Sequence, residues 1–325
     1  MDSPDVPNET QLICALARTN ISKAAFQRAS RLIGDSLDWH RVVQAAIDHD
    51  VVAPVYLNIK RRLTRAVPAP MLRTLRSTYL AQFRTSLQIR GELKRILDLL
   101  SAHEIEAVPF KGPVLAAQAY DDPNMRTFSD LDLLVRPQDV DRTDEALQAE
   151  GFEAKDPLPK TYDTHWSHYA PWHALHGNAV GYVRDPGTPG ALHVDLHWGL
   201  ASRYFMFPMH TAEIWERLVP VALENGYTVA TFSPEDTLLF LCMHATKDSW
   251  EKLSLVCDIA ELLRTHHHID HTWVLQKAET VRSVKMVLLG LYLAHRVLNA
   301  PLPVPIRHRL NAWDEREKVA DRART

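Results

Sequence analysis

The chain has 325 residues, of which 46% are hydrophobic and 24% are charged, and its formal net charge is -3. These proportions are ordinary for a soluble globular protein, and the small negative charge gives no electrostatic reason to expect nucleic acid as the main partner. The length suggests two or three packed units. The three cysteines form no C-x-x-C pair, so neither a disulfide framework nor a cysteine zinc site is indicated.

The N-terminal segment MDSPDVPNETQ is acidic and polar, unlike a secretory signal. The longest apolar runs, such as Met286–Ala294, are shorter than a membrane span. We therefore expect a cytoplasmic protein with no membrane segment.

Residues 1–104 are predicted to form an N-terminal helical region. Asp38 is placed to cap a short amphipathic helix, and from Met71 to about His103 apolar residues follow one broad side of a long helix. No side-chain pattern here indicates chemistry, so the region is interpreted as a helical support or a substrate-facing cap.

Residues 105–200 have the pattern of an α/β unit. In chain order, we predict a strand, a glycine turn, a helix, a second strand and a second helix: Ile105–Phe110, Lys111–Pro113, Val114–Tyr120, the segment around Asp130 and Asp132, and Gln138–Glu150. Gly151 is a plausible C-cap for the second helix.

The second strand carries two carboxylates inside an apolar run, in the segment Ser129-Asp130-Leu131-Asp132-Leu133. Alternate side chains of a strand share a face, so Asp130 and Asp132 are expected on one side and roughly 6–7 Å apart. Two anions this close and partly desolvated repel each other unless a cation lies between them. The pattern therefore predicts a divalent metal site.

A further strand is predicted over Ala191–Trp198, because its residues alternate cleanly between polar and apolar. His193, Asp195 and His197 share one face of it. The preceding span 162–176 is rich in aromatic residues and histidines and is expected to form short strands and loops. The glycines of Gly187–Gly190 are interpreted as a loop.

Residues 201–325 are predicted to form a C-terminal helical region, with helices resuming from Pro208. Ser233 followed by Pro234 is a strong helix start, and the helix that follows carries His244 and Lys247. We place the histidines of His266–His271 at a helix end and do not expect them to bind zinc. Cys242 and Cys257 are expected to pack in the core.

Asp130, Asp132 and Asp195 together form the carboxylate triplet that a two-metal phosphoryl-transfer site requires. The turn at Lys111 and Gly112 can let backbone amides approach a phosphate. Lys111 and Arg126 would supply positive charge to that phosphate.

These motifs resemble a known family. The pattern Phe-Lys-Gly-Pro-x-Leu around Lys111 and Gly112, then Arg126-x-x-x-Asp130-x-Asp132-Leu-Leu-Val, then the strand ending Asp195-Leu-His197-Trp198, is similar to the bacterial "uncharacterised nucleotidyltransferase" family. That family belongs to the DNA polymerase β-like nucleotidyltransferase superfamily. The similarity covers roughly residues 105–200, and a weaker similarity extends to the helices around His244, Lys247, Trp250 and Asp258.

The resemblance implies an α+β fold, with a small mixed β-sheet nucleotidyltransferase core flanked by N-terminal and C-terminal helical regions. It implies transfer of a nucleoside monophosphate from an NTP such as ATP to an acceptor hydroxyl, with Mg²⁺ or Mn²⁺ as cofactor. It assigns Asp130, Asp132 and Asp195 as metal ligands and catalytic residues, with Gly112 in the place of the superfamily's Gly-Ser turn. The resemblance does not identify the acceptor, which could be a small molecule, a glycan or a peptide.

Other residues are predicted to contact the nucleotide, and each has a structural alternative. Lys111 and Arg126 could contact phosphate or form salt bridges with the aspartates of the triplet, Asp130, Asp132 and Asp195. His197 could touch substrate, hydrogen-bond a carboxylate or pack in the sheet. His244 and Lys247, one helical turn apart, could face the nucleotide from the C-terminal region. We place acceptor specificity in the span 162–176.

Two other functions stay open. The chain has Pro113 where the superfamily has serine after the glycine, which favours a non-catalytic nucleotide-binding or interaction protein. Alternatively, His193, Asp195 and His197 could serve a metallohydrolase, although three groups in line along a strand do not by themselves make a tetrahedral zinc site.

Overall fold

The computed structural model describes residues 6–33, 37–156, 179–188, 190–200, 211–223 and 226–312. Its contacts divide the chain into two compact units. Unit 1 comprises Met1–Phe83, Ala116–Thr127 and Pro234–Thr325, and unit 2 comprises Arg84–Leu115 and Phe128–Ser233. This division differs from the three consecutive regions expected from the sequence, because helices from both ends of the chain belong to unit 1.

Unit 1 is helical. Its helices from the N-terminal half are α1 (Asn8–Leu16), α2 (Lys23–Leu32), α3 (Trp39–Asp48), α4 (Val52–Arg62), the short η1 (Thr64–Ala66) and the first part of α5 (Ala69–Ala102). From the middle of the chain come the end of α6 (Gly112–Ala119) and η2 (Pro123–Met125). The C-terminal helices are α10 (Pro234–Lys247), α11 (Leu253–Thr265), α12 (His271–Thr280), α13 (Val284–Leu298) and α14 (Val304–Asn311).

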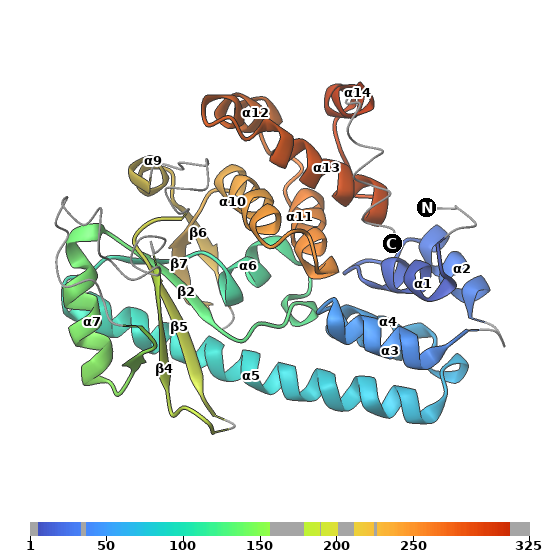
Figure 1. Ribbon diagram of the computed structural model, residues 1–325, viewed down its shortest axis with the longest axis horizontal. Helices are drawn as coiled ribbons and strands as arrows, with labels where there is room; N and C mark the ends of the chain where they lie inside the picture. Colours follow the sequence, from blue (N-terminus) through green and yellow to red (C-terminus); the bar gives the residue numbers. More distant parts are fainter. Residues whose placement is uncertain are drawn as a thin grey trace. The chain divides into compact units, whose positions relative to one another are not determined.

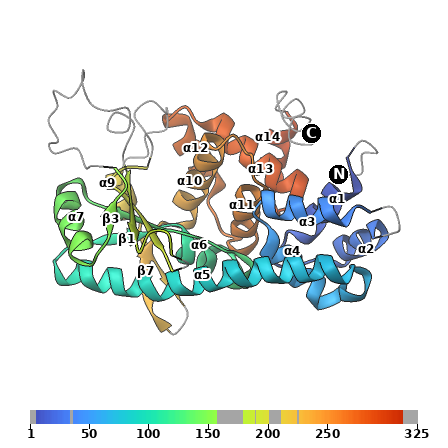
Figure 2. The same ribbon diagram turned by 60° about the horizontal axis from the view of Figure 1, so that its bottom comes forward.

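The two ends of the chain meet inside unit 1, where α1 packs against α13 (Figure 2). Leu12 and Leu16 of α1 are completely buried, as is Leu291 of α13, so one apolar core serves helices from both ends. The predicted helices over residues 9–65 and the long helix from Met71 are confirmed. Asp38 caps α3 as expected, since its side chain accepts hydrogen bonds from the backbone N–H groups of His40 and Arg41.

All three cysteines are free and buried in unit 1. Burial raises the pKa of the Cys14 thiol to about 11, and it also raises the pKa values of Cys242 and Cys257. These thiols are therefore neutral core side chains, as predicted for Cys242 and Cys257. No helix in the described part of the chain combines the length and the apolar character that crossing a membrane requires.

Unit 2 is built on a mixed five-stranded sheet with strand order β1-β2-β5-β4-β3. The strands are β1 (Ala107–Pro109), β2 (Leu131–Val135), β3 (Glu153–Ala154), β4 (Ala179–Arg184) and β5 (Leu192–His197). The strands β2 and β5 are parallel, and the other neighbouring pairs are antiparallel. Together with the helices of the chain, this sheet confirms the predicted α+β fold class.

The helical elements of unit 2 are the second part of α5, the start of α6, η3 (Pro137–Asp139), α7 (Val140–Ala149) and α9 (Thr211–Glu216). Figure 1 shows β2, β5 and β4 side by side, with α7 beside the sheet. The helix α7 stops where predicted, because Gly151 adopts a positive φ of 81° that glycine tolerates and other residues avoid.

One expectation for the C-terminal part is wrong. The chain does not become continuously helical after Pro208, because residues 219–231 contain an antiparallel hairpin of β6 (Val219–Ala222) and β7 (Thr228–Thr231). The hydroxyl of Thr231 donates a hydrogen bond of 2.7 Å to the carbonyl of Pro109 in β1. The hairpin therefore belongs with the sheet of unit 2.

Candidate functional site

Two carboxylates lie opposite each other on neighbouring parallel strands. In the register of β2 and β5, Asp132 is the Cα partner of Asp195 and Leu134 is the partner of His197. Asp132, Asp195 and His197 offer ligand atoms that all lie within 4.8 Å of one another. The predicted alternation of β5 is confirmed, since Leu192, Val194 and Leu196 are buried while the three polar side chains are half-buried.

Asp132 is the most buried member of this cluster, with a side chain only 3% exposed. The ammonium group of Lys111 donates a hydrogen bond of 3.1 Å to its Oδ1. Nε2 of His197 lies 3.3 Å from the same oxygen. Burial alone would raise the pKa of Asp132, but Lys111 and His197 outweigh it and hold the pKa well below its usual range.

Two atoms of the cluster lack a hydrogen-bond partner among the described residues. Both Oδ2 of Asp132 and Nε2 of His197 are buried in this state. Buried polar atoms without partners are uncommon and call for an explanation. A cation held by Asp132, Asp195 and His197 would satisfy both, and the two carboxylates suit Mg²⁺ or Mn²⁺. The donor set therefore fits the predicted divalent metal.

Aromatic packing fixes the imidazole of His197. The ring of Phe110 meets it edge to face, with centroids 5.1 Å apart, and Phe110 in turn stacks on the fully buried Phe232 with centroids 4.9 Å apart. The backbone N–H of Phe110 donates to the carbonyl of Asp132 at 3.3 Å. The end of β1 is thereby joined to β2 at the position of the buried carboxylate.

The turn at Lys111 and Gly112 approaches the start of β2 closely. Gly112 has a φ of 50°, and a Cβ at this position would lie 3.0 Å from the backbone oxygen of Asp130. A side chain is therefore disfavoured both by conformation and by space. Glycine here lets the chain pass close to β2, and Lys111 reaches Asp132.

The other predicted ligand, Asp130, precedes β2 and is half-buried. It is not a member of the group formed by Asp132, Asp195 and His197. Asp130 is not among the residues of β2 that pair with β5. Strand pairing therefore does not hold its side chain on the same face of the sheet as that of Asp132. Its role as a metal ligand stays a prediction.

Arg126 lies in unit 1, where it forms a bidentate ion pair with Asp258. Its Nε and Nη2 donate to the two carboxylate oxygens at 2.8 Å and 3.0 Å, and the hydroxyl of Tyr120 donates to Oδ1 at 2.6 Å. Burial, together with the Asp258 charge, raises the pKa of Tyr120, which keeps its hydroxyl protonated as a donor. Arg126 thus forms a salt bridge with Asp258, a partner outside the carboxylate triplet named in the sequence, and its predicted phosphate contact stays a prediction.

His244 and Lys247 also belong to unit 1, on α10. The ring of His244 stacks on Phe240 with centroids 5.7 Å apart and its Nε2 lies 3.6 Å from the carboxylate of Asp248. Lys247 is exposed. The contacts that the structure gives for these residues lie within unit 1, and their predicted nucleotide contacts stay predictions.

Two residues at the candidate site were missed in the sequence. Gly181 of β4 is the Cα partner of Asp195, and a Cβ on it would lie 3.2 Å from Oδ1 of Asp195 and 3.1 Å from Cδ of Lys155. The side chain of Lys155 therefore passes over β4 at Gly181, on the same face as the Asp195 carboxylate. A single glycine inside a strand signals close approach, but no sequence signal identified Lys155.

The alternative metal sites receive less support. His193 has a buried Nδ1 without a hydrogen-bond partner, but it is not part of the cluster around Asp132. His266 and His271 contact backbone carbonyls, those of Gln118 and Ile269 respectively. Across the described ranges, one group of three or more histidine, cysteine, aspartate or glutamate side chains is placed to hold a metal, and it consists of Asp132, Asp195 and His197. The span 162–176, where we expect acceptor specificity, lies outside the described residues.

Comparison with known proteins gives a family match. A family model described as "Uncharacterised nucleotidyltransferase" matches residues 35–299, and no curated protein matches the chain. Among solved structures, the chain is similar to an antigenic nucleotidyltransferase-like protein from Paracoccidioides brasiliensis. The TM-score is 0.38 and the identity 17%, and the match covers 70% of this chain and 96% of that chain.

Proposed function

Because the chain belongs to the uncharacterised nucleotidyltransferase family, as the resemblance of its sequence predicted, we propose that it moves a nucleoside monophosphate from an NTP to an acceptor hydroxyl with the help of a divalent metal. One observation carries the proposal. Asp132, Asp195 and His197 converge within 4.8 Å of one another beside Lys111, and two of their buried polar atoms have no hydrogen-bond partner. This is the donor set and the charge that a metal-bound triphosphate requires.

In this proposal, Asp132 and Asp195 hold the metal, which is Mg²⁺ or Mn²⁺, with His197 at its side. When bound, such an ion neutralises charge on the phosphates of the NTP. Asp130 stands next to β2 and is proposed as a further ligand. Lys111 keeps Asp132 ionised and is positioned to contact a phosphate oxygen as well.

The transfer itself is a substitution at the α-phosphorus. The acceptor hydroxyl oxygen forms a bond to this phosphorus, the bond to the pyrophosphate oxygen breaks, and pyrophosphate leaves. The hydroxyl proton passes to a base, and we assign Asp195 because it is half-buried on the polar face of β5. Lys155 is suited to contact the leaving pyrophosphate, since its side chain passes close to Asp195.

The proposal is tested by turnover of ATP, GTP, CTP and UTP with Mg²⁺ or Mn²⁺ in the presence of fractionated lysate acceptors. Pyrophosphate release reports the reaction, and mass spectrometry of the products identifies the acceptor. Asp132→Asn is expected to lower turnover by at least 10²-fold. Glu145→Gln, which changes an exposed residue of α7 in the same unit, is the matched control. Undiminished turnover by Asp132→Asn would refute the proposed site.

A non-catalytic nucleotide-binding protein is the second candidate, and one observation favours it. Gly112 is followed by Pro113 and not by the serine of the superfamily turn, so this position offers neither a hydroxyl nor a backbone N–H to a phosphate. The two candidates differ in a simple measurement. Tight nucleotide binding that needs no metal and yields no product with any acceptor would favour the second.

A further inference from the structure

Four histidines among the described residues have a ring nitrogen that is buried without a hydrogen-bond partner. The four atoms are Nδ1 of His49, Nδ1 of His193, Nε2 of His197 and Nε2 of His271. Such atoms are uncommon, but an unpartnered nitrogen does not by itself indicate a metal, because a cation needs several donors around it. What surrounds each nitrogen therefore decides what it can bind.

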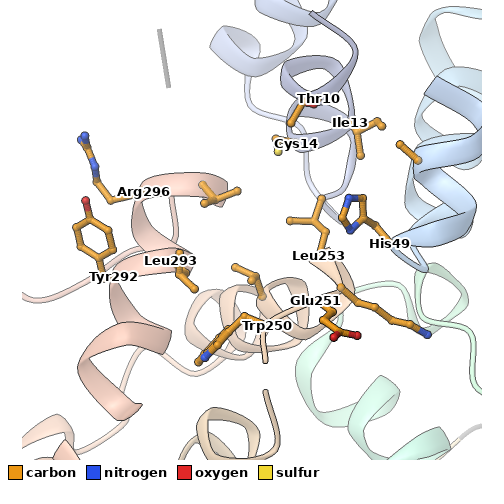
Figure 3. Close-up of a pocket in the computed structure, with 14 residues that line it drawn as sticks. Thr10, Ile13, Cys14, His49, Trp250, Glu251, Leu253, Tyr292, Leu293 and Arg296 are labelled. Carbon is orange, nitrogen blue, oxygen red and sulfur yellow. The ribbon is translucent and has the colours of Figure 1, made fainter. Parts of the chain in front are cut away.

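Three of these histidines lie outside any group of metal donors in the described ranges. His49 is in the wall of an apolar cavity of about 120 Å³ in unit 1 (Figure 3). Cys14 and Glu251 line the same cavity, but the three side chains do not converge on one point. Burial lowers the pKa of His271 and keeps its ring neutral, and Nδ1 of His193 has no carboxylates grouped around it.

His197 differs from the other three because two carboxylates lie beside it. Its Nε2 is 3.3 Å from Oδ1 of Asp132, and the ligand atoms of Asp132, Asp195 and His197 all lie within 4.8 Å of one another. An octahedral ion roughly 2.1 Å from its ligands holds adjacent ligands about 3.0 Å apart and opposite ligands about 4.2 Å apart. Small movements therefore suffice for all three donors to reach one ion.

The three donors are held in place by the sheet and by aromatic packing. Asp132 and Asp195 are Cα partners on β2 and β5, and His197 follows on the same face of β5. The ring of Phe110 meets the imidazole edge to face with centroids 5.1 Å apart, and the side chain of His197 is only 19% exposed. The ligand set is thus largely formed before an ion binds.

The charge of this ligand set is smaller than that of three carboxylates. Asp132 and Asp195 supply two negative charges and a neutral imidazole supplies none, while the ammonium group of Lys111, 3.1 Å from Oδ1 of Asp132, offsets one of the two. Mg²⁺ is a hard ion that depends on oxygen ligands and gains little from a nitrogen. First-row transition ions bind mixed nitrogen and oxygen sites, and among them Mn²⁺ retains the preference of Mg²⁺ for carboxylates.

We propose that Asp132, Asp195 and His197 form a manganese site in which Nε2 of His197 is a direct ligand, and that this nitrogen makes the site select Mn²⁺ over Mg²⁺. The inference rests on the proposed function for the presence of a divalent ion, and it deepens that function by naming the ion and its third ligand. Asp130 lies outside this group, so Mn²⁺ binding without nucleotide does not require it.

The test is titration of the full-length protein with Mn²⁺ in the absence of nucleotide, with EPR recording the free ion, followed by competition with Mg²⁺. We expect Mn²⁺ to bind more tightly than Mg²⁺ by about tenfold or more. Pulsed EPR of the bound ion should show coupling to nitrogen, and labelling the histidines with ¹⁵N should change that coupling. Equal competition by Mg²⁺, or bound Mn²⁺ without nitrogen coupling, would overturn the proposal.

Two variants of His197 separate its nitrogen from its packing. His197→Phe keeps a ring against Phe110 and removes the ligand, so the nitrogen coupling should disappear and Mn²⁺ affinity should fall about tenfold or more. His197→Glu replaces the nitrogen by a carboxylate of similar reach, so it should strengthen Mg²⁺ binding and lower the preference for Mn²⁺ about tenfold. If His197→Phe does not fold, His197→Glu still tests both the coupling and the preference.

Other histidines and Asp130 provide the controls. His49→Gln, which removes the unpartnered nitrogen of the apolar cavity, and His193→Gln on the same strand should leave the coupling and the Mn²⁺ affinity unchanged. Asp130→Asn should still bind Mn²⁺, whereas Asp132→Asn should not. Coupling that survives His197→Phe and is lost in His193→Gln would overturn the assignment of His197, as would Mn²⁺ binding that needs Asp130 but not His197.

These readouts are independent of the transfer reaction because none of them uses an NTP. Selective Mn²⁺ binding through His197 without turnover of any NTP would refute the proposed function and leave the manganese site standing. Turnover that is equally fast with Mg²⁺ in wild type and in His197→Phe would overturn the manganese site and leave the proposed function standing. Zinc in the purified protein that Mn²⁺ does not displace would overturn the assignment of manganese.

Discussion

Asp132 and Asp195 are direct Cα partners on the parallel strands β2 and β5, although they lie far apart in the sequence. Neighbouring strands lie about 4.8 Å apart, so the register alone brings two carboxylates to a distance at which they repel each other. Lys111 offsets part of this repulsion at Asp132. The remaining negative charge and the unpartnered oxygen of Asp132 are what favour a cation at this place.

Removing the charge of Lys111 should destabilise the protein. In Lys111→Met, Asp132 loses the partner that keeps it ionised, and breaking a buried ion pair on one side costs about 3 kcal/mol. The folded-state pKa of Asp132 lies below its unfolded value. The ion pair therefore contributes its full stabilisation above about pH 4, which is the pKa of an aspartate in the unfolded chain. This stabilisation is lost as the pH falls from there toward the lower pKa of the folded state.

The measurement is urea unfolding in EDTA at pH 7 and at lower pH. The difference in free energy of unfolding between wild type and Lys111→Met should be largest at pH 7 and shrink below about pH 4. Lys94→Met, which breaks an exposed ion pair with Asp98 on α5, should change stability little at either pH. An equal loss at all pH values would show that Lys111 contributes by packing and not by charge.

Enlarging Gly181 should disturb the site without unfolding the sheet. In Gly181→Ala the new methyl group lies 3.2 Å from the Asp195 carboxylate and 3.1 Å from the Lys155 side chain, so both must shift by a few tenths of an ångström. We expect Mn²⁺ affinity and any turnover to fall about tenfold, because small displacements of ligands are costly to catalysis. Titration with Mn²⁺ and a thermal unfolding curve measure the two effects.

The matched control is Gly91→Ala on α5, in the same unit, where an added Cβ meets nothing within 4 Å. Alanine is the better helix former, so this variant should gain about 0.5–1 kcal/mol and bind Mn²⁺ as wild type does. If both alanine variants bind Mn²⁺ equally well, Gly181 has no role in shaping the site.

The sequence predicts those parts of the fold that local patterns determine. The strand β5 follows from its alternation, and α10 begins at Pro234, where the capping signal of Ser233 placed it. The hairpin of β6 and β7 was missed because its strands have four residues each and β6 contains Pro220. Proline argues against a strand unless the strand lies at an edge. Both strands of this two-stranded sheet are edge strands, which becomes evident only from the pairing of β6 with β7.

The composition of the site was predictable, but its geometry was not. The sequence identifies Asp132, Asp195, Lys111 and His197 as polar residues of one α/β unit. Their convergence depends on the pairing of β2 with β5, which joins segments distant in the sequence. The proximity of Lys155 and Gly181 to Asp195 depends in the same way on the pairing of β4 with β5 and on the path of the chain after β3.

A substitution of Arg126 tests whether this residue binds the nucleotide or stabilises the fold. Its bidentate ion pair with Asp258 is largely buried, with side chains 14% and 8% exposed, so Arg126→Met should lower the free energy of unfolding by about 3 kcal/mol. Asp258→Leu should cost a similar amount, and the double variant should recover part of the loss, because replacing both charges removes the unpaired one. If Arg126→Met instead raises the KM for NTP and leaves stability unchanged, the nucleotide contact is the correct role.

Gly290 of α13 is expected to tolerate no side chain, because a Cβ there would lie 2.6 Å from Sγ of Cys242 and 3.1 Å from Cη2 of Trp250. Helix propensity alone would make Gly290→Ala stabilising by about 1 kcal/mol. The contacts reverse the sign, since overpacking a buried site costs about 1–3 kcal/mol and Cys242 is completely buried. Cys242→Ala removes the closest atom, so the double variant should be more stable than the sum of the single changes predicts. Urea unfolding of the four proteins measures this coupling, and strict additivity would mean that the helices separate to accept the methyl group.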